Sequence, residues 1–195
     1  MKKYLIEELS VFFPCYNEEK NIKLTVDKAV KVLEKTAKKW EIIIVDDGSK
    51  DKTGEVALKI QKKYPNIKIV THHPNRGYGA AFKSGLYNAK YQWIAFTDSD
   101  GQFDFSEIKN FISIQKKSKA DIVIGYYIDR KVSKAVIISS KIWELIVFIL
   151  FGLKVKDIDC GFKFINKKVV ETIPKLEAER GAFISSEFLI KAKKA

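Results

Sequence analysis

Short apolar runs that are typical of buried strands alternate with longer amphipathic segments along this 195-residue chain. The runs are four or five residues long and rich in β-branched side chains, whereas the segments between them repeat their apolar residues at helical spacing. We expect strands at residues 9–13, 41–45, 67–71, 93–97, 121–125 and 162–165. We expect helices at residues 21–39, 51–63, 79–90, 106–117, 134–153 and 185–194. This alternation predicts the α/β class, with a mostly parallel sheet that helices cover on both faces.

The same alternation indicates where a functional site would lie, because ligands of such sheets bind beyond the carboxyl ends of the strands. The polar residues that follow those ends are Tyr16, Asn17, Asp46, Asp47, His72, His73, Asp98, Asp100 and Tyr126. The chain shows no internal repeat and no linker rich in Gly, Ser or Pro. Residues 1–195 are therefore expected to form a single domain.

The segment Asp98-Ser-Asp100, which directly follows an expected strand, is the strongest candidate for chemistry. Two carboxylates two residues apart can bind one divalent cation if the strand bends, and their hard oxygen atoms suit Mg²⁺ or Mn²⁺. Gln102 would add an amide oxygen or a contact behind the metal ligands. Asp-x-Asp pairs are also common in solvated turns, and Gly101 suits such a turn, so the pair alone leaves both interpretations open.

A second pair of carboxylates, Asp46 and Asp47, follows the expected strand at residues 41–45. The next residues, Gly48 and Ser49, fit an ordinary junction from a strand through a turn to a capped helix. That junction does not explain two adjacent carboxylates at the strand end. Such carboxylates fit hydrogen bonding to a ribose or to the edge of a base.

Three further segments place polar residues at strand or helix ends. Pro14-Cys-Tyr-Asn-Glu-Glu19 follows the first strand, although Asn17 would equally cap a helix there. Asn75-Arg-Gly-Tyr-Gly-Ala-Ala81 has glycines that allow close backbone approach and a helix start near an anion, but it is not a P-loop. Asp157-Ile-Asp-Cys-Gly-Phe-Lys163 brings carboxylates, a glycine and a lysine together, and a turn into an edge strand is its alternative interpretation.

The charge of the chain favours anionic partners. Its 36 Lys and Arg residues exceed its 24 Asp and Glu residues, which gives a formal net charge of +12. Such an excess suits nucleic acid, an anionic membrane surface or phosphorylated substrates, and a merely solvated surface is the alternative. A nucleic-acid interface would interleave basic residues with exposed aromatic ones, whereas the aromatic residues here lie mainly in apolar strands and helices. We therefore expect no nucleic-acid partner.

Histidine and cysteine indicate no second chemistry. His72 and His73 have no Ser or Cys partner in a nucleophile motif, so we expect structural or loop roles for both. Cys15 and Cys160 match no metal-ligand spacing and no disulfide framework, which favours a reducing, cytosolic setting. The first nine residues lack the apolar segment of a signal peptide.

With these five segments in order, the chain resembles the family 2 glycosyltransferases of GT-A fold from residue 10 to about residue 192. Within that family it is most similar to the dolichyl-phosphate and other polyprenyl-phosphate mannosyl- and glucosyltransferases. The resemblance implies a Rossmann-like nucleotide-binding half and an inverting transfer of mannose or glucose from a GDP- or UDP-sugar to a polyprenyl or dolichyl phosphate. It also implies Mg²⁺ or Mn²⁺ as the cofactor and a location at the cytoplasmic face of a membrane.

The resemblance assigns roles to residues of the five segments. The residues that would bind the nucleotide-sugar are Pro14, Tyr16, Glu18, Val45, Asp47 and Asp98. The residues that would hold a cation bridging the donor diphosphate are Asp98, Asp100 and Gln102. Asp100 and Asp159 would be catalytic, with Asp159 facing the donor sugar or the acceptor.

Departures from the family pattern concern the acceptor phosphate. Family members usually carry arginines after the fifth strand and just before the long helix, where this chain has Tyr126 and Tyr127 and residues 135–138. The nearby basic residues, and hence the expected phosphate ligands, are Arg130, Lys131 and Lys134. The family also usually continues past the last helix with a further strand and often with transmembrane helices. We therefore expect a truncated or unusually short member.

The apolar run at residues 145–153 is too short to span a membrane. Because it is apolar on all sides, it would either be buried in the core or lie against lipid. The basic residues before it favour contact with an anionic membrane surface.

Other functions stay open on the sequence alone. A glycosyltransferase with a soluble or polysaccharide acceptor and a basic nucleic-acid-binding domain are the main alternatives. A nucleotidyltransferase would need a Gly-rich loop with a catalytic Lys or Arg, where this chain has Pro-Cys-Tyr-Asn-Glu after its first strand. The missing arginines also allow a family member that binds its ligands without catalysis.

Overall fold

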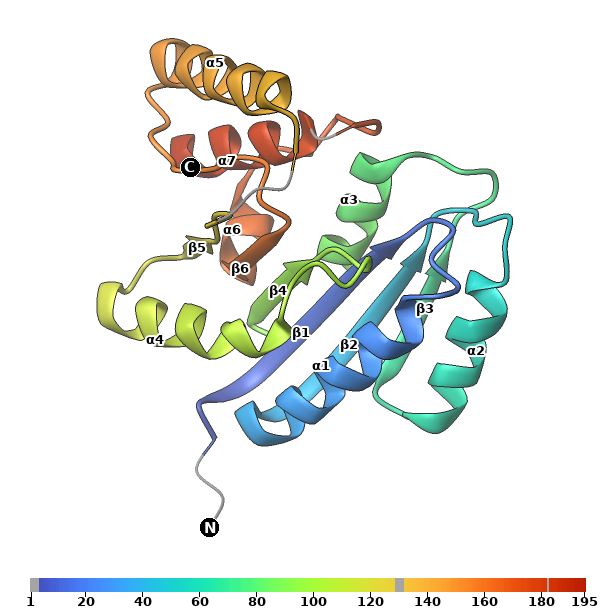
Figure 1. Cartoon of the computed structure of the whole chain (residues 1–195). Coiled ribbons are helices and arrows are strands. Elements are labelled where there is room, and N and C mark those ends of the chain that lie inside the picture. The colour runs from blue at the N-terminus through green and yellow to red at the C-terminus, as the bar shows by residue number, and fades with distance from the viewer. Residues whose placement is uncertain (1–3, 129–131, 182) are drawn as a thin grey trace.

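The structure of the chain is a computed structural model that describes residues 4–128, 132–181 and 183–195. Its sheet has the strand order β3-β2-β1-β4-β6-β5 (Figure 1). The strands are β1 (Ile6–Cys15), β2 (Ala37–Asp46), β3 (Ile67–Thr71), β4 (Trp93–Thr97), β5 (Ile122–Ile124) and β6 (Phe162–Asn166). The first four strands pair in parallel, whereas β6 lies antiparallel between β4 and β5. The prediction of an α/β fold with a mostly parallel sheet is therefore confirmed.

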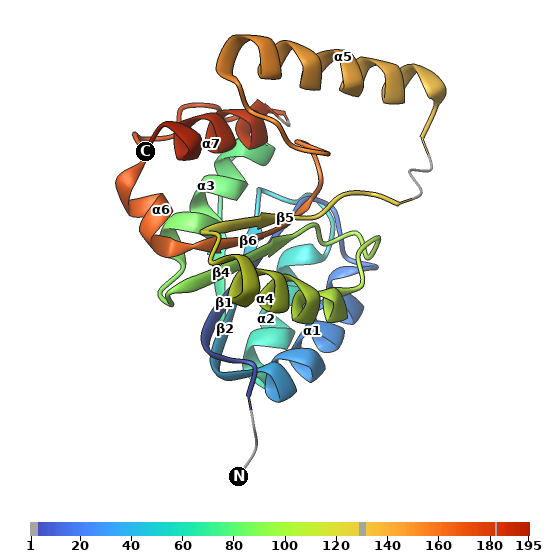
Figure 2. The same ribbon diagram turned by 90° about the vertical axis from the view of Figure 1, so that its left-hand side faces the viewer.

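Helices cover both faces of the sheet (Figures 1 and 2). They are α1 (Ile22–Thr36), α2 (Thr53–Lys63), α3 (Tyr78–Asn88), the 3-10 helix η1 (Phe105–Glu107), α4 (Ile108–Ser118), α5 (Lys134–Phe151), α6 (Lys167–Thr172) and α7 (Phe183–Lys194). Val11 and Phe13 of β1 pack with α1, α2 and α4, whereas Phe12 packs with α3 and α7. Because successive side chains of a strand point to opposite faces, one apolar run contributes to two cores.

The strands β1 and β2 are both 10 residues long, which is twice the length expected. The helix expected at residues 21–39 ends at Thr36, and Ala37 begins β2 instead. Lys39 then lies opposite Glu8 of β1, and their charged groups are 3.1 Å apart. Strand pairing, which helical spacing cannot show, therefore decides where α1 ends.

The strand β6 lies inside the sheet, with β4 on one side and β5 on the other. Phe164 of β6 stacks on Trp93 of β4 with the ring centroids 4.7 Å apart. The interpretation of residues 157–163 as a turn into an edge strand is therefore wrong about the edge. The helix α6 follows β6 directly and was not expected, because six residues are too few to show helical periodicity.

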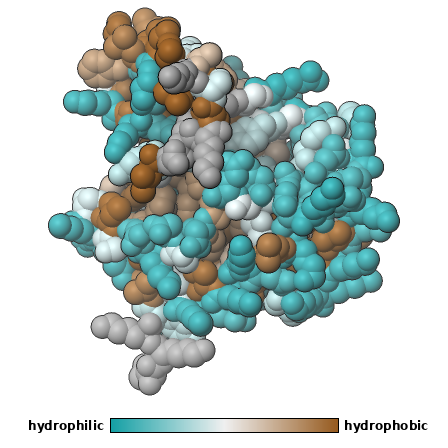
Figure 3. Space-filling view, in the orientation of Figure 1, coloured by the Kyte–Doolittle hydropathy of each residue, from teal (hydrophilic) through white to brown (hydrophobic). Residues whose placement is uncertain are grey.

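The helix α5 stands apart from the body of the molecule in Figures 1 and 2. Its apolar side chains include ten that are exposed, namely Val136, Ile137, Ile138, Ile142, Leu145, Ile146, Phe148, Ile149, Leu150 and Phe151. Val147 is the fully buried residue of the described helix. In Figure 3 the helix forms an apolar cap at the top of the molecule. The interpretation of this run as a core helix is therefore wrong.

Among the residues that the structure describes, none of the helices is long and apolar enough to cross a bilayer.

Candidate functional site

A pocket of about 370 Å³ lies beyond the carboxyl ends of β1, β2 and β4. Its lining is Pro14, Cys15, Tyr16, Glu18, Asp47, Asn75, Gly77, Tyr78, Ala81, Asp98, Ser99 and Asp100. Four of the five segments singled out in the sequence thus meet in one place, as the strand-end rule predicts. The pocket contains five of the six residues expected to bind the nucleotide-sugar.

Asp98 and Asp100, the two carboxylates that follow β4, line this pocket. The Tyr78 hydroxyl donates a hydrogen bond to Asp98 Oδ1 at 3.1 Å. Burial, and next the charge of Asp100, raise the pKa of Asp98 to about 6. Neither Asp98 nor Asp100 forms a salt bridge with any residue that the structure describes. Two nearby carboxylates that form no salt bridge fit a divalent cation.

These carboxylates would supply only part of a coordination shell. No group of three or more His, Cys, Asp or Glu side chains suited to a metal is found in the described part of the chain. Mg²⁺ is commonly held by one or two carboxylates together with substrate phosphates and water, which matches this donor set. Gln102 is exposed and absent from the pocket lining, and its backbone N–H donates to Asp100 Oδ1 at 2.9 Å. Gln102 therefore supports Asp100 through its backbone in this structure.

The fifth segment, residues 157–163, lies directly behind Asp98. Phe162 pairs with Thr97 across β4 and β6, and a Cβ added at Gly161 would overlap the Asp98 carboxylate. Asp159 is partly exposed, and its backbone N–H donates to Asp157 Oδ1 at 3.1 Å. All five segments therefore converge on one acidic edge of the sheet.

Lys163, from the same segment, is fully buried and was given no separate role in the sequence analysis. Its ammonium group donates to the carbonyl oxygen of Cys160 at 2.6 Å and to Ser185 Oγ at 3.4 Å. Burial lowers its pKa, and the negative charges nearby oppose that shift. Lys163 thus ties the turn before β6 to helix α7.

Asp47 uses its carboxylate within the chain. Oδ1 accepts from His72 Nδ1 at 2.6 Å and from the Arg76 N–H at 3.0 Å. Oδ2 accepts from Asn75 Nδ2 and from the Gly77 N–H, both at 2.8 Å. The anion at the start of α3 is therefore this aspartate, and the two amides of Arg76 and Gly77 are already bound.

The glycines of the same loop have a packing role. A Cβ added at Gly77 would lie 2.8 Å from the Glu179 carbonyl oxygen, and one added at Gly79 would lie 2.7 Å from the Ala178 carbonyl oxygen. Gly77 also has a φ of +97°, which favours glycine. The sequence indicated close backbone approach correctly, and the approaching group is the chain's own segment 178–179.

The remaining expected site residues are Val45, Arg130, Lys131 and Lys134. Val45 is fully buried in the core beside α3, and its side chain does not line the pocket. Arg130 and Lys131 lie outside the described residues. Lys134 is the first residue of α5, and its side chain also lies outside the described part.

The residues that sequence reasoning missed are Asn75, Tyr78 and Ser99. Ser99 donates to the Pro14 carbonyl oxygen at 2.7 Å and so joins the loop after β4 to the end of β1. Tyr78 sits between two glycines of a segment that we had singled out for its backbone. Its tyrosine hydroxyl, next to a predicted helix start, was the available signal.

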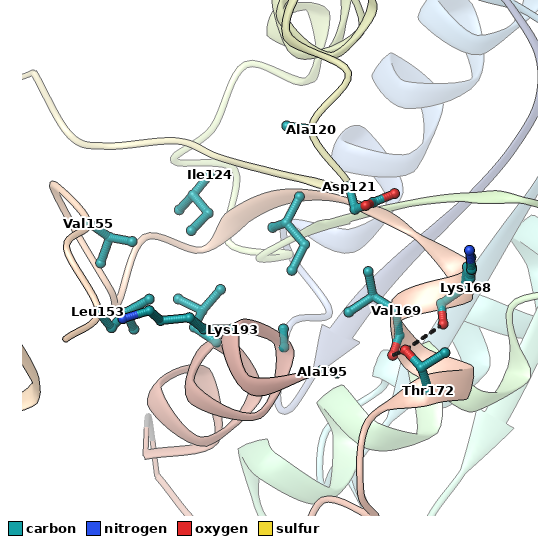
Figure 4. A pocket seen from close by; sticks show the side chains of 13 residues that line it. Ala120, Asp121, Ile124, Leu153, Val155, Lys168, Val169, Thr172, Lys193 and Ala195 are labelled. Carbon is teal, nitrogen blue, oxygen red and sulfur yellow. Dashed lines mark hydrogen bonds between the residues drawn. The ribbon is translucent and has the colours of Figure 1, made fainter. Parts of the chain in front are cut away.

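Two further hollows of comparable volume lie outside this pocket in the described part of the chain. One of about 330 Å³ lies between α5 and the loop after β5, and its lining includes Tyr126, Tyr127, Lys141, Lys156 and Asp157. The other, of about 450 Å³, lies along β5, α6 and α7 (Figure 4). The labelled side chains around it are mostly apolar, and its lining contains none of the residues expected to bind donor or cation.

Similarity to known proteins agrees with this geometry. The arrangement of a six-stranded sheet and an acidic strand edge is that of the GT-A fold. A family model described as "Glycosyl transferase family 2" matches residues 10–173. The chain therefore belongs to glycosyl transferase family 2.

Several curated relatives act on lipid phosphates according to their names. Dolichyl-phosphate beta-glucosyltransferase of Homo sapiens is 30% identical over 91% of this chain and 60% of its own length. The enzyme of the same name from Saccharomyces cerevisiae is 33% identical over 94% of this chain and 62% of its own length. Dodecaprenyl-phosphate galacturonate synthase of Rhizobium johnstonii is 30% identical over 91% of this chain and 53% of its own length. The chain thus spans less than two thirds of these relatives.

Solved structures show the same fold. Glucosyl-3-phosphoglycerate synthase of Mycobacterium tuberculosis, solved with Mn²⁺, UDP-glucose and phosphoglyceric acid, matches with a TM-score of 0.71 and 17% identity. The match covers 94% of this chain and 64% of that one. TarS of S. aureus in complex with UDP matches with a TM-score of 0.64 and 20% identity, over 95% of this chain and 54% of that one.

Proposed function

We propose that this chain is the catalytic part of an inverting, divalent-cation-dependent transferase that moves glucose from UDP-glucose to a polyprenyl phosphate such as dolichyl phosphate. The observation that carries the proposal is the Asp98 and Asp100 pair, which forms no salt bridge among the described residues and borders a pocket at the strand ends. Relatives named beta-glucosyltransferases favour glucose over mannose, and neighbours solved with UDP or UDP-glucose favour UDP over GDP.

The donor nucleoside would occupy the part of the pocket between the ends of β1 and β2. Pro14 and Tyr16 border it from one side and Asp47 from the other. Tyr16 is 44% exposed, so its ring offers a face on which a base or ribose can pack. Glu18 lines the same pocket and would accept hydrogen bonds from sugar hydroxyls.

Asp98 and Asp100 would hold Mg²⁺ or Mn²⁺ against the donor diphosphate. When bound, the cation would stabilise the charge that develops on the leaving nucleoside diphosphate. The loop before α3 cannot do this alone, because the amides of Arg76 and Gly77 are bound to Asp47. A cation at the acidic pair is thus the simplest way to neutralise the diphosphate.

The acceptor phosphate would enter from the α5 side. A phosphate monoester has a second pKa near 6 and is largely ionised at neutral pH, so it needs positioning by cations more than deprotonation. Lys141 and Lys156 line the 330 Å³ hollow beside the loop after β5, and Asp157 of the fifth segment lines it too. Arg130, Lys131 and Lys134 of the adjoining segment would add positive charge. Asp159 would face the reacting groups between donor and acceptor.

The exposed face of α5 would rest on the cytoplasmic surface of a membrane. Ile149 and Leu150 are 70% and 67% exposed, which leaves a large apolar surface in water. A helix that is apolar and does not span fits the lipid interface, where buried apolar area and basic residues both contribute to binding. Docking there would bring the phosphate of a membrane lipid to the acidic edge.

A thermal-shift screen tests the donor part of this proposal. UDP, GDP, UDP-glucose and GDP-mannose are each added with Mn²⁺, Mg²⁺ or EDTA, and a bound ligand raises the melting temperature by mass action. We expect UDP and UDP-glucose to raise it with Mn²⁺ or Mg²⁺ and to have little effect in EDTA. No shift with any sugar nucleotide, together with tight and salt-sensitive DNA binding, would favour the nucleic-acid alternative.

The choice of acceptor is tested separately. Transfer from UDP-glucose is measured to a polyprenyl phosphate in detergent and to soluble phosphorylated acids. Transfer to the lipid alone supports the proposal. Transfer only to a soluble acceptor would favour the alternative of a soluble substrate and would leave the donor assignment intact.

A further inference from the structure

His72 connects the donor pocket to helix α3 through both of its ring nitrogens. Nδ1 lies 2.6 Å from Asp47 Oδ1, and Nε2 lies 2.9 Å from Ser84 Oγ on α3. The side chains of His72 and Asp47 are only 6% and 4% exposed. A buried imidazole with both nitrogens bonded has one orientation, so it fixes the carboxylate that it contacts.

That carboxylate holds the loop that forms one wall of the pocket. It accepts from the backbone N–H groups of Arg76 and Gly77 and from the side chain of Asn75. Asn75 and Gly77 both line the pocket, as does Asp47 itself. The position of this wall therefore depends on how Asp47 is oriented.

Asp47 cannot hold its orientation through the loop alone. All three loop contacts belong to the segment that Asp47 itself anchors, residues 75–77. His72, in contrast, follows β3, and its backbone N–H donates to the Asp46 carbonyl oxygen at 2.9 Å. Its second contact is with Ser84, which lies in the middle of α3. The imidazole thus fixes the orientation of Asp47 relative to two elements outside the loop, strand β3 and helix α3.

We propose that His72 is a positioning residue of the nucleotide pocket, which sets donor affinity by orienting Asp47 and, through it, the backbone of residues 75–77. The inference rests on the proposed function, since it takes a nucleoside diphosphate as the ligand of this pocket. It assigns to His72 an effect on donor binding and none on the chemical step or on the acceptor.

Three substitutions distinguish the contributions of the two ring nitrogens of His72. His72→Asn keeps an amide donor near the position of Nδ1 and loses the contact with Ser84, whereas His72→Leu loses both contacts at similar bulk. Ser84→Ala removes the partner of Nε2 while His72 keeps its contact with Asp47. His73→Asn is the matched control, because the neighbouring histidine is exposed.

The first readout needs no ligand. Hydrogen exchange of the Arg76 and Gly77 amides is expected to be slow in the parent and at least tenfold faster in His72→Leu, because a loosened carboxylate releases both donors. His72→Asn should restore most of the protection, and His73→Asn should leave it unchanged. Equal protection in the parent and in His72→Leu would contradict the anchoring role.

The second readout is the affinity for UDP with Mn²⁺, measured by calorimetry, with the steady-state constants for UDP-glucose. Loss of one buried hydrogen bond to a charged group corresponds to a roughly tenfold change in an equilibrium constant. We expect Kd and donor KM to rise about tenfold in His72→Leu and less than threefold in His72→Asn and Ser84→Ala, with kcat and acceptor KM within twofold of the parent.

Failure of this inference and failure of the proposed function give different results. If the parent binds UDP and His72→Leu binds it equally well, the positioning role is wrong and the donor assignment stands. A fall in kcat with an unchanged donor KM would contradict it as well. If the parent binds no nucleotide, the proposed function fails and the inference fails with it, whatever the exchange rates show.

Discussion

The two halves of the sheet, one with β1, β2 and β3 and the other with β6 and β5, differ in how the segments beside them are held in place. On the side of β1, β2 and β3, polar bonds within the chain connect the loops that form the pocket. Asn17 exchanges hydrogen bonds with Ser49 and Lys50 at 3.0 and 2.8 Å, and the Glu18 N–H donates to Thr53 Oγ1 at 2.8 Å. On the side of β6 and β5, helix α5 instead presents a broad apolar face to solvent.

This difference supports the ligand that we propose for each side. A pocket whose loops are already bonded to each other needs little reordering when a ligand binds, and this lowers the cost of binding. Helix α5 contacts the rest of the chain at points that include Val147, Trp143, whose indole N–H donates to Ser186 Oγ at 2.9 Å, and Phe151, whose carbonyl oxygen accepts from Lys193 Nζ at 3.0 Å. Its remaining apolar surface is stable in water only at a cost that a lipid surface would remove.

The largest effect is expected from the acidic pair on the donor side. Asp98→Ala or Asp100→Ala should reduce transfer by about 10²–10³-fold, because each removes a charge that would hold the cation at the leaving group. Calorimetry of UDP with Mn²⁺ and a transfer assay measure the loss. Asp121→Asn, at the opposite end of the sheet, is the control. Unchanged Mn²⁺-dependent affinity in both alanine variants would remove the metal role.

A smaller effect on the same site is expected from Gly161→Ala. The new Cβ would overlap the Asp98 carboxylate and must displace it, which should weaken Mn²⁺-dependent UDP binding by roughly ten- to a hundredfold and cost about 1–3 kcal/mol of stability. Gly181→Ala, whose new Cβ meets no atom within 4 Å, is the control without a clash, and its positive φ adds a backbone strain that Gly161→Ala does not have. Parent-like affinity in Gly161→Ala would show that the acidic pair is not held by this contact.

The α5 side is tested by Ile149→Asn combined with Leu150→Asn. Burying each side chain in lipid contributes about 1.5–3 kcal/mol at most, so the pair should reduce co-sedimentation with anionic liposomes by at least tenfold. The melting temperature and UDP affinity should not change. Leu58→Asn, at a leucine on α2 that is 54% exposed, should leave liposome binding intact. Equal liposome binding by the double variant and the parent would contradict membrane docking by α5.

The smallest effect is expected from segment 178–179, which packs against Gly77 and Gly79. Glu179 pairs with Arg76 at 2.9 Å, but both side chains are about half exposed. Exposed pairs contribute little to stability because water and salt screen them, so Glu179→Gln should barely change the melting temperature and should change UDP affinity less than threefold. Thermal unfolding and calorimetry measure both. A tenfold loss of affinity would mean that segment 178–179, and not Asp47, positions the loop.

The donor side was the easier part to predict from the sequence. Polar residues follow the apolar runs that predict the strands, so the end of each run marks them. Parallel strands bring those ends to one edge of the sheet. Asp47 and Asp98 were therefore placed together without any knowledge of contacts. What the pattern could not show was which partner each carboxylate has, because His72 and Gly161 come from distant parts of the chain.

The other side was harder to predict, for physical reasons. The strand β5 was predicted at residues 121–125, but a pattern of strands does not show which strands pair, so the position of β6 between β4 and β5 could not be predicted. The apolar run of α5 has the same composition whether it is buried or exposed, so periodicity alone could not decide between them. The glycines of residues 75–81 were predicted to allow close backbone approach, but the pattern could not show that the approaching groups are the carbonyl oxygens of residues 178 and 179.

The most direct test of the central claim is transfer of radiolabelled glucose from UDP-glucose to a polyprenyl phosphate in the presence of Mn²⁺. The chain is incubated with both substrates in detergent, and the label is then followed into the organic phase. We predict metal-dependent label on the lipid that EDTA and Asp100→Ala both abolish, while Asp121→Asn retains it. Label that reaches the lipid equally well in EDTA and in Asp100→Ala would contradict the assignment of the acidic edge.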